Sequence, residues 1–405
     1  MASIGNLHLG ACEDDEGICH PTAIGCALLT PLKVDIRWSC VNGDWLVTAK
    51  KGLPYISARS RQQINFEETK HQGITALMQA LDLACVQNNL ILNLSKPGDS
   101  FYALYRDNGD FVLRFTDTLN FVCSMNISGQ VRDRDGNIVP QPESPKPQWH
   151  RAFLYYRLSQ LAADVYEAYR NLYLAFEALA ESCYPRKENE REGEWIRRCF
   201  RELHTHHGLT SFAPHGHSAP NEYLFGTLYE HTRCNLFHSR TEDTILPFYE
   251  IDTTKIKNAY ETLLRIWRYI ACAVLKVNGG GGVITYEGYR HRMDSVFGQS
   301  IAVAVTDDPI PVKDSDTSIS PGNHKVVTLS SCRYIGEIMP GLIGIEAEER
   351  NIQQLPTIHR IGLIANNVLL AATNIDFGLN LIGVDKFQFF FNQRLIQGSL
   401  PKVQF

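Results

Sequence analysis

The longest regular pattern of apolar positions in the chain lies in residues 149–183. Apolar side chains recur there at steps of three and four residues, which places them along one face of an α-helix. The stripe comprises Phe153, Leu154, Leu158, Leu161, Val165, Ala168, Tyr169, Leu172, Phe176 and Leu179. Pro185 follows, and proline cannot continue a helix. The pattern therefore predicts one long helix with a single packing face.

Three later segments also predict helices. They span about 188–205, 220–238 and 253–277. The first is strongly charged but places Trp195, Cys199 and Leu203 at every fourth position. Asp252 is suited to begin the last helix as its N-cap, and Asn278-Gly279 is suited to end it. Together with the long helix, these segments predict a four-helix bundle.

Residues 1–138 instead show short apolar runs that are typical of strands. Asn-Gly pairs at Asn42-Gly43 and Asn108-Gly109 separate such runs, which is a strong hairpin signal because both residue types tolerate positive φ. One amphipathic helix is expected at 73–86. The expected strands are 27–41, 44–52, 89–95, 100–107, 110–116 and 119–127. This order indicates a small α+β domain of mostly antiparallel strands.

Two segments separate the helical region from its neighbours. Residues 139–148 contain Pro140, Pro142, Pro145 and Pro147, which indicates a stiff linker. Four glycines at 279–282 indicate a hinge before a second strand-rich region at 283–405. We therefore predict an α+β multidomain fold, in which a central all-α bundle at 149–278 is flanked by an N-terminal α+β domain and a C-terminal β-rich domain.

Composition and net charge limit the kinds of molecule that the protein is expected to bind. The chain has 405 residues, of which 44% are hydrophobic and 20% charged, as expected of a soluble globular protein. Its formal net charge of −5 means that any contact with nucleic acid must use a local basic patch. The 11 cysteines are irregularly spaced, which favours reduced thiols in a cytoplasmic protein. No apolar run approaches the roughly 18–20 residues of a membrane span, so no membrane partner is expected.

Candidate chemistry centres on HTRCNLFHSR, residues 231–240, which contains Arg233 and His238. Arg201 and His206 repeat the same Arg-x4-His spacing upstream. Five residues of α-helix rotate a side chain by about 500°, so the two members of a pair point roughly 140° apart. They cannot share one face of a straight helix, which favours a site at a helix end or across a dimer.

The residue types suit metal-independent RNA cleavage. A histidine exchanges protons near neutral pH, so His238 can remove the proton from a 2′-OH. An arginine grips a phosphate through paired N–H donors, so Arg233 can stabilise the charge that develops there. The spacing alone favours a different interpretation, in which the arginine forms a helix-end salt bridge and the histidine caps a carbonyl.

The sequence context separates Arg233 and His238 from their upstream counterparts. DVYEAYRNLYLAFEALAES at 164–182, followed after a charged helix by LYEHTRCNLFHSR at 228–240, resembles the HEPN family in its methylamine-utilisation J-like branch. The resemblance spans about 150–277. It implies a bundle of four to five helices and a homodimer that binds RNA or nucleotides at a cleft shared between subunits.

The resemblance also implies an activity and roles for single residues. The activity is that of an endoribonuclease giving a 2′,3′-cyclic phosphate, acting as a toxin or antiviral-defence effector, with an antitoxin or sensor protein as a possible partner. Arg233 would bind the phosphate and His238 would be the general acid or base. The family often has Asn, Asp or His directly after the arginine, where this chain has Cys234. The expected auxiliary residues are His231, Asn235, Arg170 and Glu177. The last two are proposed from the sequence itself, because they are seven residues apart and share a face of the first predicted helix; a salt bridge with a neighbouring helix is the alternative.

Two alternatives stay open. The first is a non-catalytic HEPN module that binds nucleotides or a protein partner, which Cys234 and the acidic net charge favour. The second is a metal-dependent enzyme using the histidines of the segment predicted as a loop. These are His204, His206, His207, His215 and His217. No pair of them has the i, i+4 spacing of a helical zinc site. We therefore predict no metal and no other cofactor.

Overall fold

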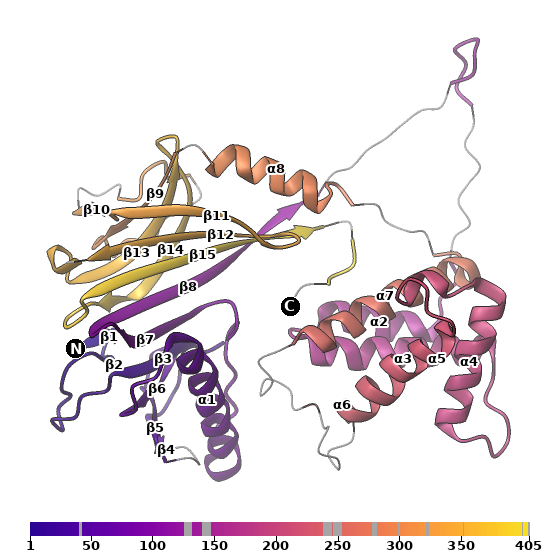
Figure 1. Cartoon of the computed structure of the whole chain (residues 1–405), viewed down its shortest axis with the longest axis horizontal. Coiled ribbons are helices and arrows are strands. Elements are labelled where there is room, and N and C mark those ends of the chain that lie inside the picture. The colour runs from indigo at the N-terminus through magenta and orange to yellow at the C-terminus, as the bar shows by residue number, and fades with distance from the viewer. Residues whose placement is uncertain are drawn as a thin grey trace. The chain divides into compact units, whose positions relative to one another are not determined.

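The structure of the protein is a computed structural model (Figure 1). It describes residues 1–39, 43–124, 132–139, 147–237, 245, 253–277, 282–298, 300–313, 315–320, 324–350, 352–398 and 400–403. The chain divides into two compact units. Unit 1 consists of Met1–Phe121 and Ile284–Leu395, and unit 2 of Val122–Val283 and Ile396–Phe405. Each unit therefore joins segments that are far apart in the sequence.

Unit 1 contains a nine-stranded sheet with the order β11-β12-β15-β8-β7-β3-β6-β5-β4. Its strands are β3 (Thr22–Ala27), β4 (Ile36–Ser39), β5 (Trp45–Ala49), β6 (Tyr55–Ser60), β7 (Phe101–Asp107), β8 (Asp110–Cys123), β11 (Ser331–Met339), β12 (Leu342–Arg350) and β15 (Lys386–Gln397). The pairings with a defined register are all antiparallel. β8 and β15 are neighbours, so they join the N-terminal strands to the C-terminal ones.

A six-stranded antiparallel sheet has the order β10-β9-β13-β14-β1-β2. Its strands are β1 (Ala2–Ile4), β2 (Leu7–Gly10), β9 (Ile301–Thr306), β10 (Val326–Thr328), β13 (Thr357–Ala365) and β14 (Val368–Asn380). Here too the two ends of the chain meet, because Ser3 of β1 pairs with Asn380 of β14. A short 3₁₀ turn, η3 (Ile352–Gln354), precedes β13.

The predicted fold class is therefore wrong. It placed a central all-α HEPN-like bundle between an N-terminal α+β domain at 1–138 and a C-terminal β-rich domain at 283–405. The structure is instead mixed α/β, with strands from both regions paired in the same two sheets. The helical unit is not an all-α domain of HEPN type, since it incorporates the extended C-terminal segment that begins at Ile396. Local periodicity predicted the strands but carries no information on which distant strands pair.

Two helices pack in unit 1. α1 (Phe66–Asn88) begins with a capping box between Asn65 and Glu68 and lies against the core formed by β3, β5, β6 and β7. A Cβ atom at Gly73 of α1 would come within 2.5 Å of Ile24, so only glycine permits this close approach. α8 (Tyr286–Phe297) was not predicted. It buries Tyr289, Met293 and Phe297 at every fourth position.

Unit 2 consists mainly of helices (Figure 1). They are α2 (Arg151–Leu161), α3 (Val165–Cys183), α4 (Glu192–His207), the 3₁₀ turn η1 (Thr210–Phe212), α5 (Pro220–Phe225), the π-helix η2 (Gly226–Cys234), α6 (Asn235–Phe237) and α7 (Thr254–Leu275). The C-terminal segment lies on these helices: the Lys402 amide donates to Gln160 at 2.7 Å, and the Tyr260 hydroxyl donates to the Lys402 carbonyl at 2.9 Å.

The helix predicted at 149–183 is two helices. α2 ends at Leu161, and Asp164 begins α3 by accepting hydrogen bonds from the amides of Tyr166 and Glu167, both at 2.9 Å. A side chain that caps a new helix competes with continuation of the old one. The apolar stripe is also interrupted, because Leu161 is 67% exposed.

Several predicted boundary residues lie outside the described residues. They are the turn residue Asn42, the helix N-cap Asp252, the helix-ending Asn278 and most of the proline-rich linker. β4 and β5 nevertheless pair as the predicted hairpin, with Ser39 opposite Leu46. The runs at 110–116 and 119–127 lie largely in one strand, β8, whereas 89–95 forms only the bridge from Leu94 to Leu28. Among the described helices, none combines the length and apolar character needed to cross a bilayer.

Candidate functional site

A π-helix sets the position of Arg233. η2 continues directly from α5, and its wider turn places the Thr232 hydroxyl 2.7 Å from the carbonyl of Thr227, five residues back. Tyr169 of α3 donates to the carbonyl of Leu228 at 2.5 Å and so ties η2 to the neighbouring helix. π-Helical turns are uncommon and are frequent at functional sites. The sequence predicted one regular helix at 220–238 and gave no sign of this change.

The Arg233 side chain lies in an enclosed, largely aromatic environment. Its Nη2 atom is 2.6 Å from Oε1 of Glu192, at the start of α4. The Arg233 side chain is 13% exposed and that of Glu192 is 35% exposed. The guanidinium carbon also lies 5.0 to 5.9 Å from the ring centroids of Phe237, Tyr229 and Tyr173. Ring faces attract cations, and burial strengthens that attraction.

Glu177 of α3 places a second titratable group near this cation. Burial raises the pKa of Glu177 to about 7, and the nearby Arg233 guanidinium only partly offsets this effect. Burial alone would lower the pKa of Arg233, but the carboxylates of Glu192 and Glu177 raise it above its ordinary value. The site therefore combines a permanent cation with a carboxyl group whose pKa is near neutral pH, and such a carboxyl group can serve as a general acid or base.

Arg170 is the second auxiliary residue that lies at this site. Its Nη2 atom donates to the carbonyl of Leu236 at 3.1 Å, and its guanidinium lies 5.7 Å from the Phe237 ring centroid. It thus holds α6, the segment directly before His238. His238 itself is outside the described residues.

The remaining auxiliary residues lie near the same helix end. His231 is exposed, and the carbonyl of Asn235 accepts a hydrogen bond from the Ile245 amide at 3.0 Å. Cys234 is half-buried. Arg233, Glu177 and Arg170 are thus the predicted residues that the structure brings together.

The upstream pair, Arg201 and His206, lies in different surroundings. Both side chains belong to α4 and are exposed, and His206 lies 3.8 Å from Glu202. Neighbouring histidines have structural contacts: His204 accepts from the Leu209 amide at 3.1 Å, and His217 accepts from the Ala219 amide at 3.3 Å. Within the described ranges, no group of three or more His, Cys, Asp or Glu side chains is arranged to hold a metal ion.

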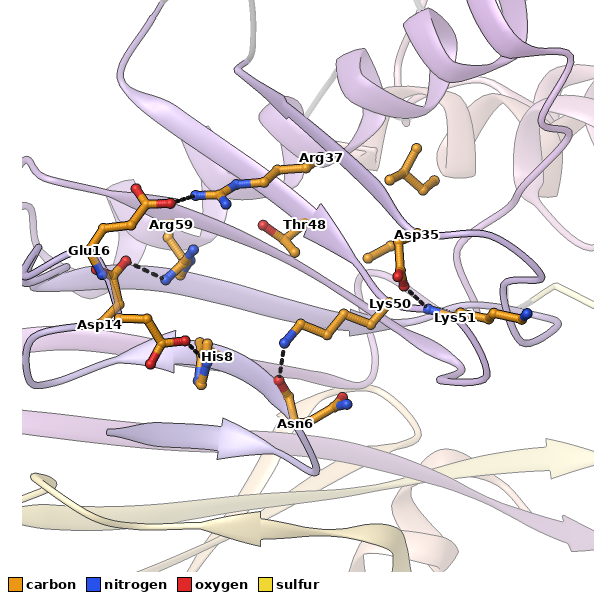
Figure 2. A pocket seen from close by; sticks show the side chains of 13 residues that line it. Asn6, His8, Asp14, Glu16, Asp35, Arg37, Thr48, Lys50, Lys51 and Arg59 are labelled. Atoms are coloured by element: carbon orange, nitrogen blue, oxygen red, sulfur yellow. Dashed lines mark hydrogen bonds and ion pairs between the residues drawn. The ribbon is translucent and has the colours of Figure 1, made fainter.

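The sequence did not predict a polar pocket of about 470 Å³ in unit 1 (Figure 2). Its lining residues come from β2, β4, β5 and β6 and from the turns and loops next to these strands, so no short motif contains them. Alternating polar positions on β4 to β6 were the available signal, but they are also typical of any solvated sheet face.

No family model, curated protein or solved structure matches this chain. The resemblance to the HEPN family therefore stays a prediction made from the residues alone. The function has to be inferred from the geometry and electrostatics of the sites themselves.

Proposed function

We propose that unit 2 is a metal-independent endoribonuclease, with Arg233 as the phosphate-binding cation and His238 as the proton carrier. The observation that supports this proposal is the enclosed Arg233 guanidinium with Glu177, whose pKa is about 7, within electrostatic reach. A structural ion pair gains nothing from a second carboxyl group whose pKa is raised to about 7 by burial. Acid–base catalysis does gain from it, because such a group can both lose and supply a proton at physiological pH.

The reaction follows from these groups. His238 removes the proton from a ribose 2′-OH, and that oxygen attacks the adjacent phosphorus atom. Arg233 donates two N–H···O hydrogen bonds to the phosphate oxygens and stabilises their growing negative charge. The bond from phosphorus to the 5′-oxygen breaks, and protonated Glu177 donates its proton to that leaving oxygen. The products are a 2′,3′-cyclic phosphate and a 5′-hydroxyl end.

The aromatic side chains suit a single-stranded substrate. Phe237 is 37% exposed, and its ring lies beside the Arg233 guanidinium. The ring of Tyr229, on η2, lies beside the same guanidinium. Unstacked RNA bases bind by stacking on such rings. A strand whose phosphate reaches Arg233 would therefore place a neighbouring base against Phe237. Double-stranded RNA, with its bases stacked internally, is expected to be a poor substrate.

The proposal is tested by incubating the full-length protein with single-stranded RNA in EDTA. We expect cleavage to a cyclic phosphate, and a loss of about 100-fold or more in Arg233→Ala and in His238→Ala. Arg201→Ala and His206→Ala are matched controls, because they have the same residue types and spacing at an exposed position. Wild-type protein that leaves RNA intact, or activity that persists in both site variants, would contradict the proposal.

A dimer that shares its sites between subunits is the second part of the proposal. An Arg233→Ala subunit and a His238→Ala subunit would together form a site with one intact arginine and one intact histidine. We therefore expect mixing of the two inactive variants to restore part of the activity. Light scattering should show a dimer. A monomer, or mixtures without activity, would restrict the chemistry to one subunit.

In the cell, such an activity fits a toxin or antiviral-defence effector held in check by an antitoxin or sensor protein. Expression of the wild-type chain is then expected to arrest growth, whereas Arg233→Ala should not. Equal growth of both strains would contradict this role without affecting the proposed chemistry.

A second candidate function is favoured by the Glu192–Arg233 contact. At 2.6 Å, Glu192 occupies the guanidinium that a phosphate would need. If the contact persists, the site binds nucleotides or a partner without cleaving RNA. Nucleotide binding by the wild-type protein, without RNA turnover and weakened in Arg233→Ala, would support this candidate over the nuclease.

A further inference from the structure

The pocket in unit 1 lies on the face of the nine-stranded sheet opposite α1. Trp45, Val47 and Ala49 of β5 belong to the core under α1, so Thr48, between them, points to the other face. Arg37 of β4 lies opposite Thr48 in the antiparallel register. Lys50 and Arg59 complete the row of polar side chains on this face (Figure 2).

Arg59 is the most enclosed charged group of this pocket. It is 4% exposed, and its Nη1 atom lies 3.3 Å from Oδ2 of Asp14. Asp14 is itself fixed, because its Oδ1 atom accepts from the amides of Glu16 and Ile18, both at 3.0 Å. These contacts hold the guanidinium in place. A buried arginine keeps its charge, so it provides a preorganised cation at the wall of the pocket.

Three buried polar atoms of the pocket lack a hydrogen-bond partner within the described part of the chain. They are Nε of Arg59, Oγ1 of Thr48 and Nδ1 of His8. Each such atom costs free energy on folding, so they are uncommon in native proteins. A cluster of them around one pocket indicates groups that are satisfied by something bound there. Two of the three, Arg59 Nε and Thr48 Oγ1, can donate a hydrogen bond, which calls for an acceptor oxygen on the ligand.

The mouth of the pocket has a different character. Asp15, Glu16 and Asp35 are exposed carboxylates, and carboxylates accept hydrogen bonds from hydroxyl groups. Lys50 donates to the carbonyl of Asn6 at 2.7 Å, and Lys51 is exposed beside it. No Phe, Tyr or Trp side chain is among the described residues that line the pocket, so the large ring faces on which bases commonly stack are missing there.

We propose that this pocket binds a phosphorylated sugar, with its phosphate at Arg59, Thr48 and Lys50 and its hydroxyl groups at the carboxylates of the mouth. The pocket volume of about 470 Å³ is within the range of small-molecule sites. Free sugar phosphates and the ribose phosphate of a nucleotide share this chemistry. The site is in unit 1 and does not depend on RNA cleavage by unit 2.

Ribose 5-phosphate, AMP, inorganic phosphate and ribose distinguish the parts of this proposal in calorimetric titrations of the full-length protein. We expect ribose 5-phosphate to bind with a Kd below about 1 mM. AMP should bind within a few-fold of it, since the base finds no partner. Phosphate and ribose should each bind at least about tenfold more weakly. Absence of binding by ribose 5-phosphate, or equal affinity for phosphate alone, would overturn the proposal.

Thr48→Val is the sharpest variant. Valine has the same shape and favours strands, so removal of an unsatisfied buried hydroxyl should leave the melting temperature unchanged or raise it. The affinity for ribose 5-phosphate should nevertheless fall about tenfold, because a hydrogen bond to a charged group is lost. Lys50→Met should also weaken binding. Lys50 is partly exposed, so this variant tests the same site at a position where the substitution does not alter the buried core.

Thr69→Val is the matched control. The Thr69 hydroxyl donates to the Asn65 carbonyl at 2.7 Å, so its loss should lower the melting temperature and leave the affinity unchanged. If Thr48→Val behaves like Thr69→Val, the Thr48 hydroxyl has only a structural role and the proposed ligand site is wrong.

Discussion

Arg233 of unit 2 and Arg360 of unit 1 form nearly identical ion pairs in opposite surroundings. Each guanidinium has an Nη2 atom close to a carboxylate oxygen, at 2.6 Å for Glu192 and 2.7 Å for Asp308. Arg360 and Asp308 are 1% and 0% exposed, whereas Glu192 is 35% exposed. The pair of Arg360 and Asp308 is thus fully buried in unit 1, whereas in unit 2 Glu192 is exposed enough for another ligand of Arg233 to replace it.

Their further partners explain the difference. Asp308 also accepts from the Ile310 amide at 3.0 Å and the Ser320 hydroxyl at 3.1 Å, and Arg360 donates to the Ile319 carbonyl at 2.7 Å. Burial alone would raise the pKa of Asp308, but these hydrogen bonds and Arg360 lower it. Arg233 instead has aromatic rings and Glu177, which titrates near neutrality. Burial of an arginine in an ion pair therefore does not by itself separate a structural role from a functional one; for these two pairs the exposure and titration of the neighbouring carboxyl groups make the difference.

The largest effect is expected when the sealed pair is broken. Asp308→Ala leaves the Arg360 guanidinium buried without its carboxylate, which should lower the free energy of unfolding by about 3–5 kcal/mol. Glu192→Ala exposes Arg233 to water through the space that Glu192 vacates, so we expect a loss of about 1 kcal/mol or less. Urea unfolding of both variants measures this contrast. Equal losses would mean that the two pairs have the same structural role.

The next effect concerns activity. Arg233→Lys keeps the charge but loses the planar pair of donors that matches a phosphate, so RNA cleavage should fall by about 100-fold while stability changes little. Arg360→Lys is the matched substitution in unit 1 and should show the reverse: lower stability, with full activity in the protein that remains folded. An active Arg233→Lys variant would show that charge alone suffices and that the phosphate geometry proposed for Arg233 is wrong.

The sequence predicted much of unit 2 but not the contacts that give Arg233 its character. Spacing identified α4 and α7 within a few residues, because helical periodicity is a local property. The π-helix at η2 depends on contacts such as that of Tyr169 with the Leu228 carbonyl, which no local pattern encodes. Glu192 was missed because it is 41 positions from Arg233 in the sequence and has no distinctive spacing.

Unit 1 shows the same limit more strongly. The alternation in β5 and β7 predicted strands, but their sheet is completed by strands more than 200 residues away. The residues of the sugar-phosphate pocket all lie between positions 6 and 59, but they come together only when β4, β5 and β6 pair and the segment around β2 lies against them. Asp14 lies in a loop before the first strand of this sheet, and Arg59 is a buried charged residue within β6, which no spacing rule singles out. Composition and spacing could therefore predict neither the fold class nor this pocket.

Glu177 should make unit 2 less stable as the pH rises. Its pKa is about 7 in the folded state and 4.5 as its ordinary value. Between these values the folded state binds a proton that the unfolded state has lost, so the free energy of unfolding decreases from about pH 4.5 to 7 and is flat above. Glu177→Gln removes this dependence, and at pH 8 it should be about 1–3 kcal/mol more stable than wild type.

Urea unfolding at pH 5 and pH 8 measures this difference. Glu167→Gln is the control on the same helix, because Glu167 is exposed and should leave the pH dependence unchanged. A Glu177→Gln variant with the wild-type slope would assign the dependence to another group and would remove Glu177 as the proton donor to the leaving oxygen.

The smallest expected effect distinguishes the nuclease from the non-catalytic binding site. Glu192→Gln keeps the shape of the side chain but removes the charge that competes with a phosphate for Arg233. If the 2.6 Å contact between Glu192 and Arg233 exists only in the free protein and RNA displaces it, KM for RNA should fall about threefold in this variant. The value of kcat should stay unchanged, because Glu192 competes with the phosphate only before RNA is bound.

Glu202→Gln is the matched control, since Glu202 is also on α4 and its side chain is also 35% exposed. A drop in kcat at constant KM would instead mean that Glu192 orients Arg233 during the reaction. Unchanged constants would mean that Arg233 does not bind the phosphate at all, because a charge 2.6 Å from a phosphate-binding cation must affect its affinity.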